Sequence, residues 1–473
     1  LYDQLGIRGR GNSTWGFDKK PYRIKFNKKQ EFLGPERAKA KSWTLLANYA
    51  DKTLIRNAVA ACIGEFAGMP FNAAAQFVDL VVNGEYLGNY QISDQMEVRE
   101  KRVEITEQDT PMTDDSDISG GYFLEVDGFA QNEPAYFTTN RGVKVTIKSP
   151  DDEIIDKRQI EYIRNHYNKF ESALFSPNFT DPDNGYRQYV DSLTLAQWYV
   201  ASELTGNPDC FWSTYMHKEK GDDRLFWGPL WDYDIAFNNC DRIGDVTRTL
   251  MADKGFGADL TKIWVNRMRQ DPWFASLINR TWKDLVNAGI EQHIIDYIDN
   301  TAALIEDSQK LNFAKWPINR HDYNELVLFS TYAEGVNYLK DFIRNHIVFL
   351  SEEFRKAAGD NTPTPVETFV PDPHYYYTFS NRSNGLYADV SNGSVVVNSR
   401  DALASSQQWA LDIVSDGWFR IVNRNNGMAI TDVAQQGLTG YQGGAQLAMR
   451  NIDNADESQQ WKAEPMTTGN CYV

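Results

Sequence analysis

The stretch Glu203–Asn239, ELTGNPDCFWSTYMHKEKGDDRLFWGPLWDYDIAFNN, carries three aspartates around a predicted β-hairpin. Asp209 follows an Asn-Pro pair, and Asp232 and Asp234 lie in an aromatic-rich segment. A turn at 219–223 is expected to place the start of one strand beside the end of the next. The three carboxylates should then meet at one edge of a sheet. This arrangement suits metal-assisted phosphoryl transfer, in which one carboxylate accepts a hydroxyl proton and others hold magnesium.

A purely structural interpretation of the same stretch stays open. In it, Asp209 caps a turn after Pro208, and the segment WDYD is a core strand with two surface acids. The aromatic neighbours Trp231, Tyr233 and Phe237 argue against simple solvation of the carboxylates. Spacing alone does not decide between the two interpretations.

Length and composition set broad limits on the protein. A chain of 473 residues is too long for one core and predicts two or three domains. The net charge of −17 argues against non-specific binding of nucleic acid and favours a basic protein substrate. The aromatic fraction of 13% is high and suits carbohydrate contact as well as core packing. No apolar run is long enough to predict a membrane span, and the start at Leu1 suggests a segment of a longer protein. The cysteines show no metal-type spacing and predict no disulfide framework: Cys62, Cys210, Cys240 and Cys471.

A glycine-rich block opens the chain, LGIRGRGNSTWGFDKKPYRIKF at Leu5–Phe26. Its glycines alternate with Arg8, Arg10 and Asn12 and lead into a strand with alternating apolar and basic residues. Backbone N–H groups and guanidinium groups in such a turn can bind phosphates. The alternative is a tight basic hairpin without a ligand.

The next segments predict a helix and a hairpin. The stretch 43–57 is expected to turn into a helix that continues to about Gly68, with Asp51 as its N-cap. Asn83-Gly84 between two apolar runs predicts a hairpin over 76–92.

A strand pair further along carries a second set of candidate residues. Glu125 lies on the strand Gly120–Asp127, and Lys148 lies near the end of the strand Arg141–Pro150. A lysine facing an acidic strand is what a nucleotide kinase uses to hold phosphates, although surface pairs of this kind are common. Beyond these strands, helical patterns dominate up to Gly359.

The chain changes character after a proline-rich stretch, Gly359–His374, which predicts an interdomain linker. The remainder is rich in Asn, Ser and Gly and repeats itself. SNRSNGLYADVSNG at 380–393 resembles VNRNNGMAITDVAQQG at 422–437, and QQWAL at 407–411 resembles QQWKA at 459–463. Two similar units side by side are therefore expected.

The first part of the chain resembles the spore coat protein H (CotH) kinase family. The motifs that carry the resemblance are IRGRGNSTW with KKPYRIKF, WTLLANYADKTLIRN, VNGEYLGNYQI, GGYFLEVD and NPD…GPLWDYDIAF, in that order. The resemblance implies an α+β, atypical protein-kinase-like domain with a large helical C-terminal part. It also implies an ATP- and Mg²⁺-dependent Ser/Thr protein kinase.

Residue by residue, the resemblance makes Asp209 the catalytic aspartate and Asp232 a metal-binding aspartate. It places Arg8, Arg10 and Asn12 near the nucleotide phosphates. Asp234 as a second metal ligand, and Lys148 with Glu125 as nucleotide-binding residues, are inferred from the pattern. The sequence departs from protein kinases at Thr214, where they place a metal-binding Asn, which puts the second metal in doubt.

The C-terminal part resembles the ricin-type β-trefoil lectins through its two Gln-x-Trp motifs. A trefoil needs three such units, and only two with the start of a third are found. The family implies sugar contacts from Asp389 and Asp432, with Tyr387 and Tyr441 as stacking platforms. The Gln-x-Trp motif itself is expected in the core, and many such domains have lost sugar binding.

These observations predict three segments: a CotH-like kinase domain at 1–358, a linker at 359–374 and an all-β ricin-type domain at 375–473. We expect an atypical protein kinase with a carbohydrate-binding module, located outside the cytoplasm or on the cell surface. One alternative is a non-catalytic surface protein with a kinase-like scaffold. Another is a nucleotidyl transferase that uses the same carboxylates.

Overall fold

The computed structural model describes residues 5–360, 371, 375–380, 386–401, 403–415, 417–433 and 447–463. The chain divides into two compact units, Leu1–Asn361 and Thr362–Val473. Unit 1 combines two five-stranded antiparallel sheets with helices, and unit 2 is all-β among the residues described. The linker predicted at 359–374 falls mostly outside the described residues.

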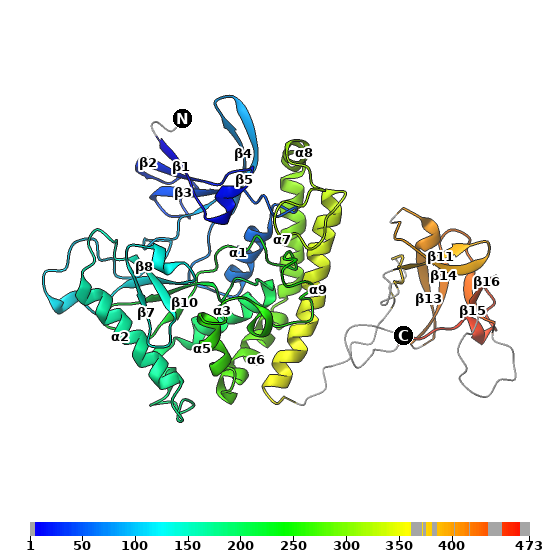
Figure 1. Cartoon of the computed structure of the whole chain (residues 1–473). Helices are drawn as coiled ribbons and strands as arrows, with labels where there is room; N and C mark the ends of the chain where they lie inside the picture. The colour runs from blue at the N-terminus through cyan, green and yellow to red at the C-terminus, as the bar shows by residue number, and fades with distance from the viewer. Residues whose placement is uncertain are drawn as a thin grey trace. The chain divides into compact units, whose positions relative to one another are not determined.

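The first sheet has the strand order β1-β2-β3-β5-β4 and forms the upper part of unit 1 (Figure 1). The two faces of β2 differ in character, since its residues alternate. Ile24 and Phe26 pack into a small core with Trp43, while Arg23 and Lys25 point to the opposite side. The strands are β1 Leu5–Gly9, β2 Tyr22–Gln30, β3 Ala40–Leu46, β4 Gln76–Val82 and β5 Glu85–Asp94.

The hairpin predicted around Asn83-Gly84 is confirmed, and both residues have positive φ, at 53° and 84°. The helix predicted to follow Asp51 and continue to about Gly68 is confirmed as α1, but it begins later than an N-cap at Asp51 requires and spans Arg56–Phe66. Ahead of it, Trp43 lies on β3, between β2 and β5.

Asp51 is not the N-cap of α1, since that position belongs to Ile55. Its carboxylate nevertheless accepts the backbone N–H of Arg56 (2.8 Å) and pairs with the guanidinium of the same residue. The predicted contact between Asp51 and the helix start therefore exists, but with a loop between them.

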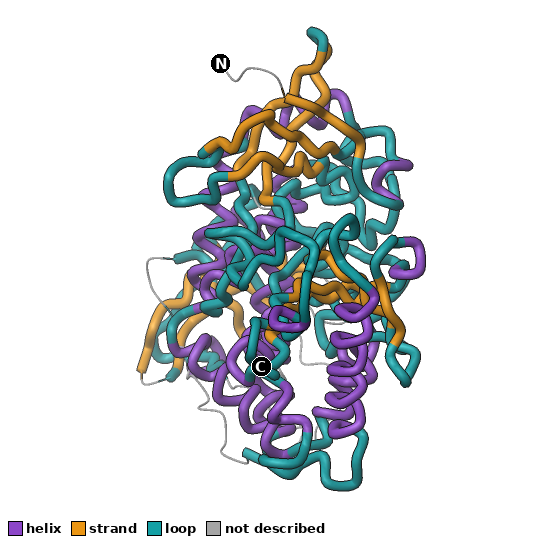
Figure 2. The backbone as a smooth tube through the Cα atoms, turned by 90° about the vertical axis from the view of Figure 1, so that its left-hand side faces the viewer, coloured by secondary structure: helices purple, strands orange, loops and turns teal. Residues whose placement is uncertain are grey.

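The second sheet lies below the first in Figures 1 and 2 and has the order β10-β9-β6-β8-β7. The predicted hairpin after Asp209 is confirmed as β9 paired with β10, although β10 is only two residues long. The strands are β6 Tyr122–Asp127, β7 Tyr136–Thr138, β8 Lys144–Ser149, β9 Ser213–Lys218 and β10 Phe226–Trp227.

Helices fill most of the remainder of unit 1 and enclose its main apolar core. The longest, α9, starts with a capping box, in which Thr331 and Glu334 satisfy each other's backbone N–H groups. The helices besides α1 are α2 Lys157–Leu174, α3 Ser192–Thr205, α4 Met251–Lys254, α5 Thr261–Met268, α6 Pro272–Asn287, α7 Ile290–Leu304, α8 Glu306–Lys315 and α9 Tyr332–Ala357.

A buried lysine fixes the first sheet to the helices. The ammonium group of Lys19 donates to the carbonyls of Ala47 (2.6 Å) and Asn89 (2.5 Å) and to Oδ1 of Asn312 on α8 (2.9 Å). Figure 1 shows α8 beside β4 and β5. Because three acceptors match the three N–H donors of an ammonium group, this contact holds the glycine-rich segment at a fixed place relative to α8.

Unit 2 repeats one hydrogen-bond pattern. Gln407 accepts from a backbone N–H six residues earlier (2.8 Å) and donates to a carbonyl eight residues earlier (2.9 Å). Gln459 does the same, at 3.0 and 2.9 Å. Both glutamines and Trp409 are buried, which confirms that the Gln-x-Trp motifs lie mostly in the core. The sheet has the order β11-β12-β16-β15-β14-β13, with β11 Tyr387–Ser391, β12 Ser394–Asn398, β13 Trp409–Ser415, β14 Trp418–Asn423, β15 Ala429–Asp432 and β16 Leu447–Arg450.

Candidate functional site

A pocket of about 360 Å³ gathers most of the residues that the sequence analysis selected. We call it the carboxylate pocket. Its walls come from the glycine-rich segment, from the ends of β3, β6 and β8, and from both sides of the β9–β10 hairpin. The selected residues that line it are Arg10, Asn12, Glu125, Lys148, Asp209, Asp232 and Asp234.

Asp209 lies shortly before β9, and hydrogen bonds from the side chain of Asn207 fix the backbone there. The side chain of Asn207 accepts the backbone N–H of Asp209 (3.1 Å) and donates to the carbonyl of Asp232 (3.2 Å). One amide thus ties the two acidic segments together. The carboxylate of Asp209 accepts no hydrogen bond from another described residue, so the interpretation of Asp209 as a turn cap is wrong.

Asp232 occupies a strained position in the irregular segment after β10. Its φ of 67° is left-handed, a conformation that non-glycine residues adopt rarely and often at functional sites. Asn57 holds the next residue, because its Oδ1 accepts the backbone N–H of Tyr233 (2.7 Å). This backbone shape places Asp232 and Asp234 on the same pocket.

The negative charge of Asp232 raises the proton affinity of the other two aspartates. Burial and the charge of Asp232 raise the pKa of Asp209 to about 6, with Arg242 opposing the shift. Burial raises the pKa of Asp234 well above its usual value, and Asp232 raises it further.

Desolvation by the surrounding protein also raises the pKa of Asp232, and the nearby positive charge of Arg10 opposes this shift. The side chain of Asp232 is exposed, however, because it borders the open space of the pocket. A bound cation would stabilise the charged form of these carboxylates.

Arg10 brings a positive charge to the same place. Its guanidinium lies over the ring of Trp231, at 5.3 Å from the centroid, and burial lowers its pKa while Asp232 opposes the shift. Two glycines shape the turn around it. A Cβ at position 9 would lie 2.2 Å from the ring of Trp15, and Gly11 has a φ of +86°.

Lys148 and Glu125 form the ion pair that the strand pattern predicted, with 2.9 Å between Nζ and Oε2. The Oγ of Ser213 donates to the other oxygen of Glu125 (2.5 Å). Burial opposes the charge of Lys148, but Glu125 outweighs it and raises the lysine's pKa. Lys148 therefore brings a second positive charge, paired with Glu125, to the pocket that Arg10 also lines.

Two selected positions do not enter the pocket. Arg8 is exposed on β1 and is not among the lining residues. Thr214 is buried and donates to the carbonyl of Cys210 (2.8 Å), so it faces away from the pocket and is no substitute for a metal-binding Asn. Its neighbour Ser213 lines the pocket instead.

Several lining residues were not predicted as site residues from the sequence: Asn48, Asn57, Asp127, Glu133, Ser213, Tyr215 and Trp231. The alternation of β9 offered a signal for Ser213 and Tyr215, since both lie on one face of that strand. The asparagines carried no such signal, because only the tertiary fold brings them to the pocket.

The donor set of the pocket fits magnesium bound together with phosphates. Among the described residues, no group of three His, Cys, Asp or Glu side chains is arranged to hold a metal alone. Mg²⁺ usually takes one or two carboxylates and completes its shell with phosphate oxygens and water. Asp232 and Asp234 supply carboxylates of this kind, and neither side-chain carboxylate accepts a hydrogen bond from another described residue.

The candidate sugar-binding residues of unit 2 differ in their surroundings. The carboxylate of Asp389 accepts hydrogen bonds from the side chains of Asn398 (3.0 Å) and Gln407 (3.2 Å). Burial alone would raise the pKa of Asp389, but its hydrogen bonds outweigh that effect and lower the pKa below its usual value. Asp432 is exposed at the end of β15. Tyr387 is half-buried on β11, with Arg400 5.8 Å from its ring centroid. Tyr441 lies outside the described residues.

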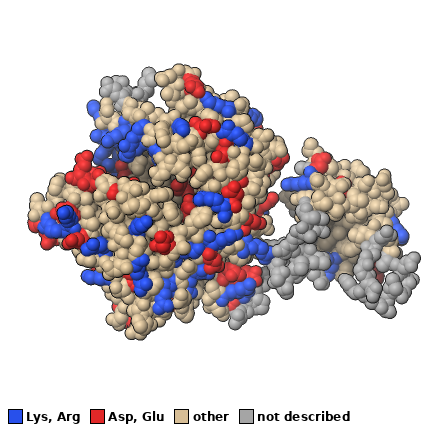
Figure 3. Space-filling view, viewed as in Figure 1, with Lys and Arg blue, Asp and Glu red and all other residues tan. Residues whose placement is uncertain are grey.

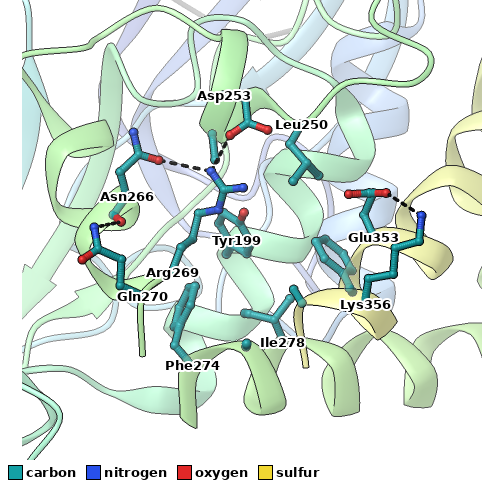
Figure 4. A pocket seen from close by; sticks show the side chains of 14 residues that line it. Tyr199, Leu250, Asp253, Asn266, Arg269, Gln270, Phe274, Ile278, Glu353 and Lys356 are labelled. Atoms are coloured by element: carbon teal, nitrogen blue, oxygen red, sulfur yellow. Dashed lines mark hydrogen bonds and ion pairs between the residues drawn. The ribbon is translucent and has the colours of Figure 1, made fainter. Parts of the chain in front are cut away.

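A second cavity, of about 780 Å³, lies in unit 1 between α3, α5, α6 and α9 (Figure 4). Its charged side chains are paired with one another. Arg269 donates to Asp253 (2.6 Å), and Lys356 lies 3.5 Å from Glu353. The charges that line this cavity are thus neutralised, in contrast to the carboxylate pocket.

The carboxylate pocket thus combines a glycine-rich turn, an ion-paired lysine and three aspartates. A family model described as "CotH kinase protein" matches residues 7–350. The match spans well over half of the chain, and the chain therefore belongs to the CotH kinase family. A second family model, "Ricin-type beta-trefoil lectin domain-like", matches residues 368–441 and 405–473.

Other comparisons add little. No curated protein matches this chain. Among solved structures, it is similar to the designed three-fold symmetric protein ThreeFoil, with 24% identity over 20% of this chain and 66% of that one. The TM-score of that match is 0.17. Among the described residues, no helix has the length and apolar character needed to cross a membrane.

Proposed function

We propose that this protein is an ATP- and Mg²⁺-dependent protein kinase with a kinase-like fold in unit 1. The observation that carries the proposal is the convergence of Asp209, Asp232 and Asp234 in one pocket with Arg10 and Lys148. A loose phosphoryl-transfer transition state needs positioning and charge stabilisation, and these five side chains supply both.

Each side chain has a distinct role in the proposal. Asp232 and Asp234 hold magnesium, which neutralises the phosphates of the nucleotide. Arg10 and Lys148 contact phosphate oxygens, and Asn12 supports the glycine-rich turn. Asp209 accepts the proton of a substrate hydroxyl and orients that hydroxyl toward the γ-phosphate. Its raised pKa, near 6, suits a base that works close to neutral pH.

The rim of the pocket favours a basic protein as the substrate. Asp127 and Glu133 line the pocket besides the three aspartates and Glu125, whereas only Arg10 and Lys148 carry positive charge there. Bound magnesium cancels only about half of the negative charge of a nucleoside triphosphate, so the occupied pocket stays negative. The excess of carboxylates then attracts a positively charged segment around the acceptor hydroxyl.

Intact-mass measurement after incubation with MgATP and a basic protein tests the proposal. Added phosphate on the chain or on the basic protein supports a kinase. Added AMP would instead indicate a nucleotidyl transferase. Unchanged masses at every ATP concentration would favour a non-catalytic scaffold and contradict the proposal.

Lys148→Gln is expected to weaken binding of MgATP about tenfold, because a charge-assisted hydrogen bond to phosphate is lost. Glu125 keeps its bond from Ser213, so the fold should persist. Lys144→Gln on the same strand, outside the pocket, is the matched control and should bind normally. Calorimetric titration measures both, and equal affinities would remove Lys148 from the nucleotide site.

Unit 2 is proposed to bind a polysaccharide, which suits a location outside the cytoplasm or at a cell surface. The support is the lectin-like family match together with Asp389, Asp432 and Tyr387 on one sheet. We expect Asp432→Ala to weaken polysaccharide binding by the full chain about tenfold, through loss of a charged hydrogen-bond acceptor. Asp412→Ala, another exposed acid of this sheet, is the control. A glycan array blank with the parent chain would leave unit 2 a structural module.

A further inference from the structure

Two arginines of the first sheet oppose each other without a counter-charge. Arg8 on β1 is the direct cross-strand partner of Arg23 on β2. Like charges in this position destabilise a sheet, because their side chains leave on the same face at a short separation. Burial lowers the pKa of Arg23, and the charge of Arg8 lowers it further. The pair is therefore costly for the folded protein as it stands.

The surroundings do not neutralise this pair. Among the described residues, neither Arg8 nor Arg23 forms an ion pair. The Nη2 of Arg23 donates to the hydroxyl of Ser42 (3.1 Å), while its Nε is buried without a partner. Glu97 lies near enough to attract Arg23, but Glu97 already accepts hydrogen bonds from two other arginines: Arg99 and Arg102.

The pair also lies at an open edge next to the carboxylate pocket. The first sheet ends at β1, with no described strand on its outer side, and β1 is exposed along its length. Arg10, two residues after Arg8, already lines the pocket. In Figure 3, basic side chains gather over the upper left of unit 1, directly above a group of acidic ones.

We propose that Arg8 and Arg23 form a binding site for a phosphomonoester, carried by an already phosphorylated segment of a protein partner. Two guanidinium groups on one face match the charge and the several acceptor oxygens of a phosphate dianion. An extended segment can pair its backbone with the open edge of β1 and place its phosphorylated side chain over the two arginines.

This site is separate from the nucleotide phosphates, because Arg8 does not line the pocket. It deepens the proposed function by assigning a class of protein partner, namely a phosphoprotein whose phosphate lies next to the acceptor hydroxyl's site. Binding to Arg8 and Arg23 does not itself require catalysis. The two proposals therefore fail in different experiments.

Calorimetry on the full chain tests the site with a phosphoserine peptide, its unphosphorylated twin and inorganic phosphate. The phosphopeptide is expected to bind at least about tenfold more tightly than its twin. Arg8→Gln and Arg23→Gln should each weaken binding of the phosphopeptide about tenfold, and added salt should weaken binding to the parent chain. Lys29→Gln, an exposed lysine elsewhere on β2, is the matched control and should change it less than about twofold.

Three results would overturn the proposal. Equal binding of the phosphopeptide and its twin would leave the arginines without this ligand. Inorganic phosphate that binds as tightly as the peptide would make a free anion the ligand. A parallel loss of MgATP affinity in Arg8→Gln, of the same size as the loss for the peptide, would assign Arg8 to the nucleotide. Because Arg8 is exposed, its variant should fold, and the melting temperature verifies this.

Discussion

Asp209→Asn is expected to lower phosphate incorporation at least about 10²-fold while leaving MgATP binding unchanged. The substitution keeps the size of the side chain and removes the charge that orients and deprotonates the substrate hydroxyl. The free energy of unfolding should change by less than about 1 kcal/mol, because the carboxylate of Asp209 accepts no hydrogen bond from another described residue. Phosphate incorporation and melting temperature are measured on one preparation.

Glu133→Gln provides the matched control, since Glu133 is an acid of the same pocket without a catalytic role in the proposal. Its effect on incorporation should stay below about threefold. Activity of Asp209→Asn equal to that of the parent chain would remove Asp209 from the mechanism. A large loss of stability with retained activity would restore the structural interpretation.

Asp232→Asn is expected to weaken magnesium-dependent nucleotide binding at least about 100-fold. Loss of a residue that only hydrogen-bonds to a metal ligand already lowers metal affinity by about 10–100-fold, and loss of a direct ligand should cost at least as much. Asn is the appropriate replacement, since it tolerates the left-handed φ of 67° at this position better than Ala does. Calorimetric titration with a non-hydrolysable ATP analogue, with and without Mg²⁺, measures the effect.

The condition without magnesium separates metal binding from simple electrostatics. There, Asp232→Asn should bind the nucleotide as well as the parent chain or better, because a repulsive charge has been removed from the pocket. An equal loss with and without magnesium would mean that Asp232 supports the pocket and does not hold the metal.

Local pattern was sufficient to predict the elements in which one signal dominates. Asn83-Gly84 predicted its hairpin, and the alternation along β2 predicted which side chains face the core. The stretch from Trp43 to Asp51 received no strand prediction, because its apolar run fits either structure. The decision came from β2 and β5, which pair with it on both sides.

In the candidate site, too, residues with a local sequence signal could be predicted and residues placed by tertiary contacts could not. Asp209, Asp232 and Lys148 could be predicted, since their roles depend on residue type and on nearby strands. Asn57 and Asn207 could not be predicted. Each is an uncharged side chain that hydrogen-bonds to a backbone group far away in the sequence, at Tyr233 and Asp232 respectively. The alternation of Arg8 and Arg10 suggested equal roles, but only the second lies where the chain turns into the pocket.

The close contact between Gly9 and Trp15 has a consequence for how related sequences can vary. A methyl group at position 9 would overlap the indole ring, at 2.2 Å from its atoms. Because Trp15 is 44% exposed, alanine at this position requires either that the indole ring moves outward or that the residue at position 15 becomes smaller. In an alignment of relatives, these two positions should covary as a pair, and sequences that retain the tryptophan should retain the glycine.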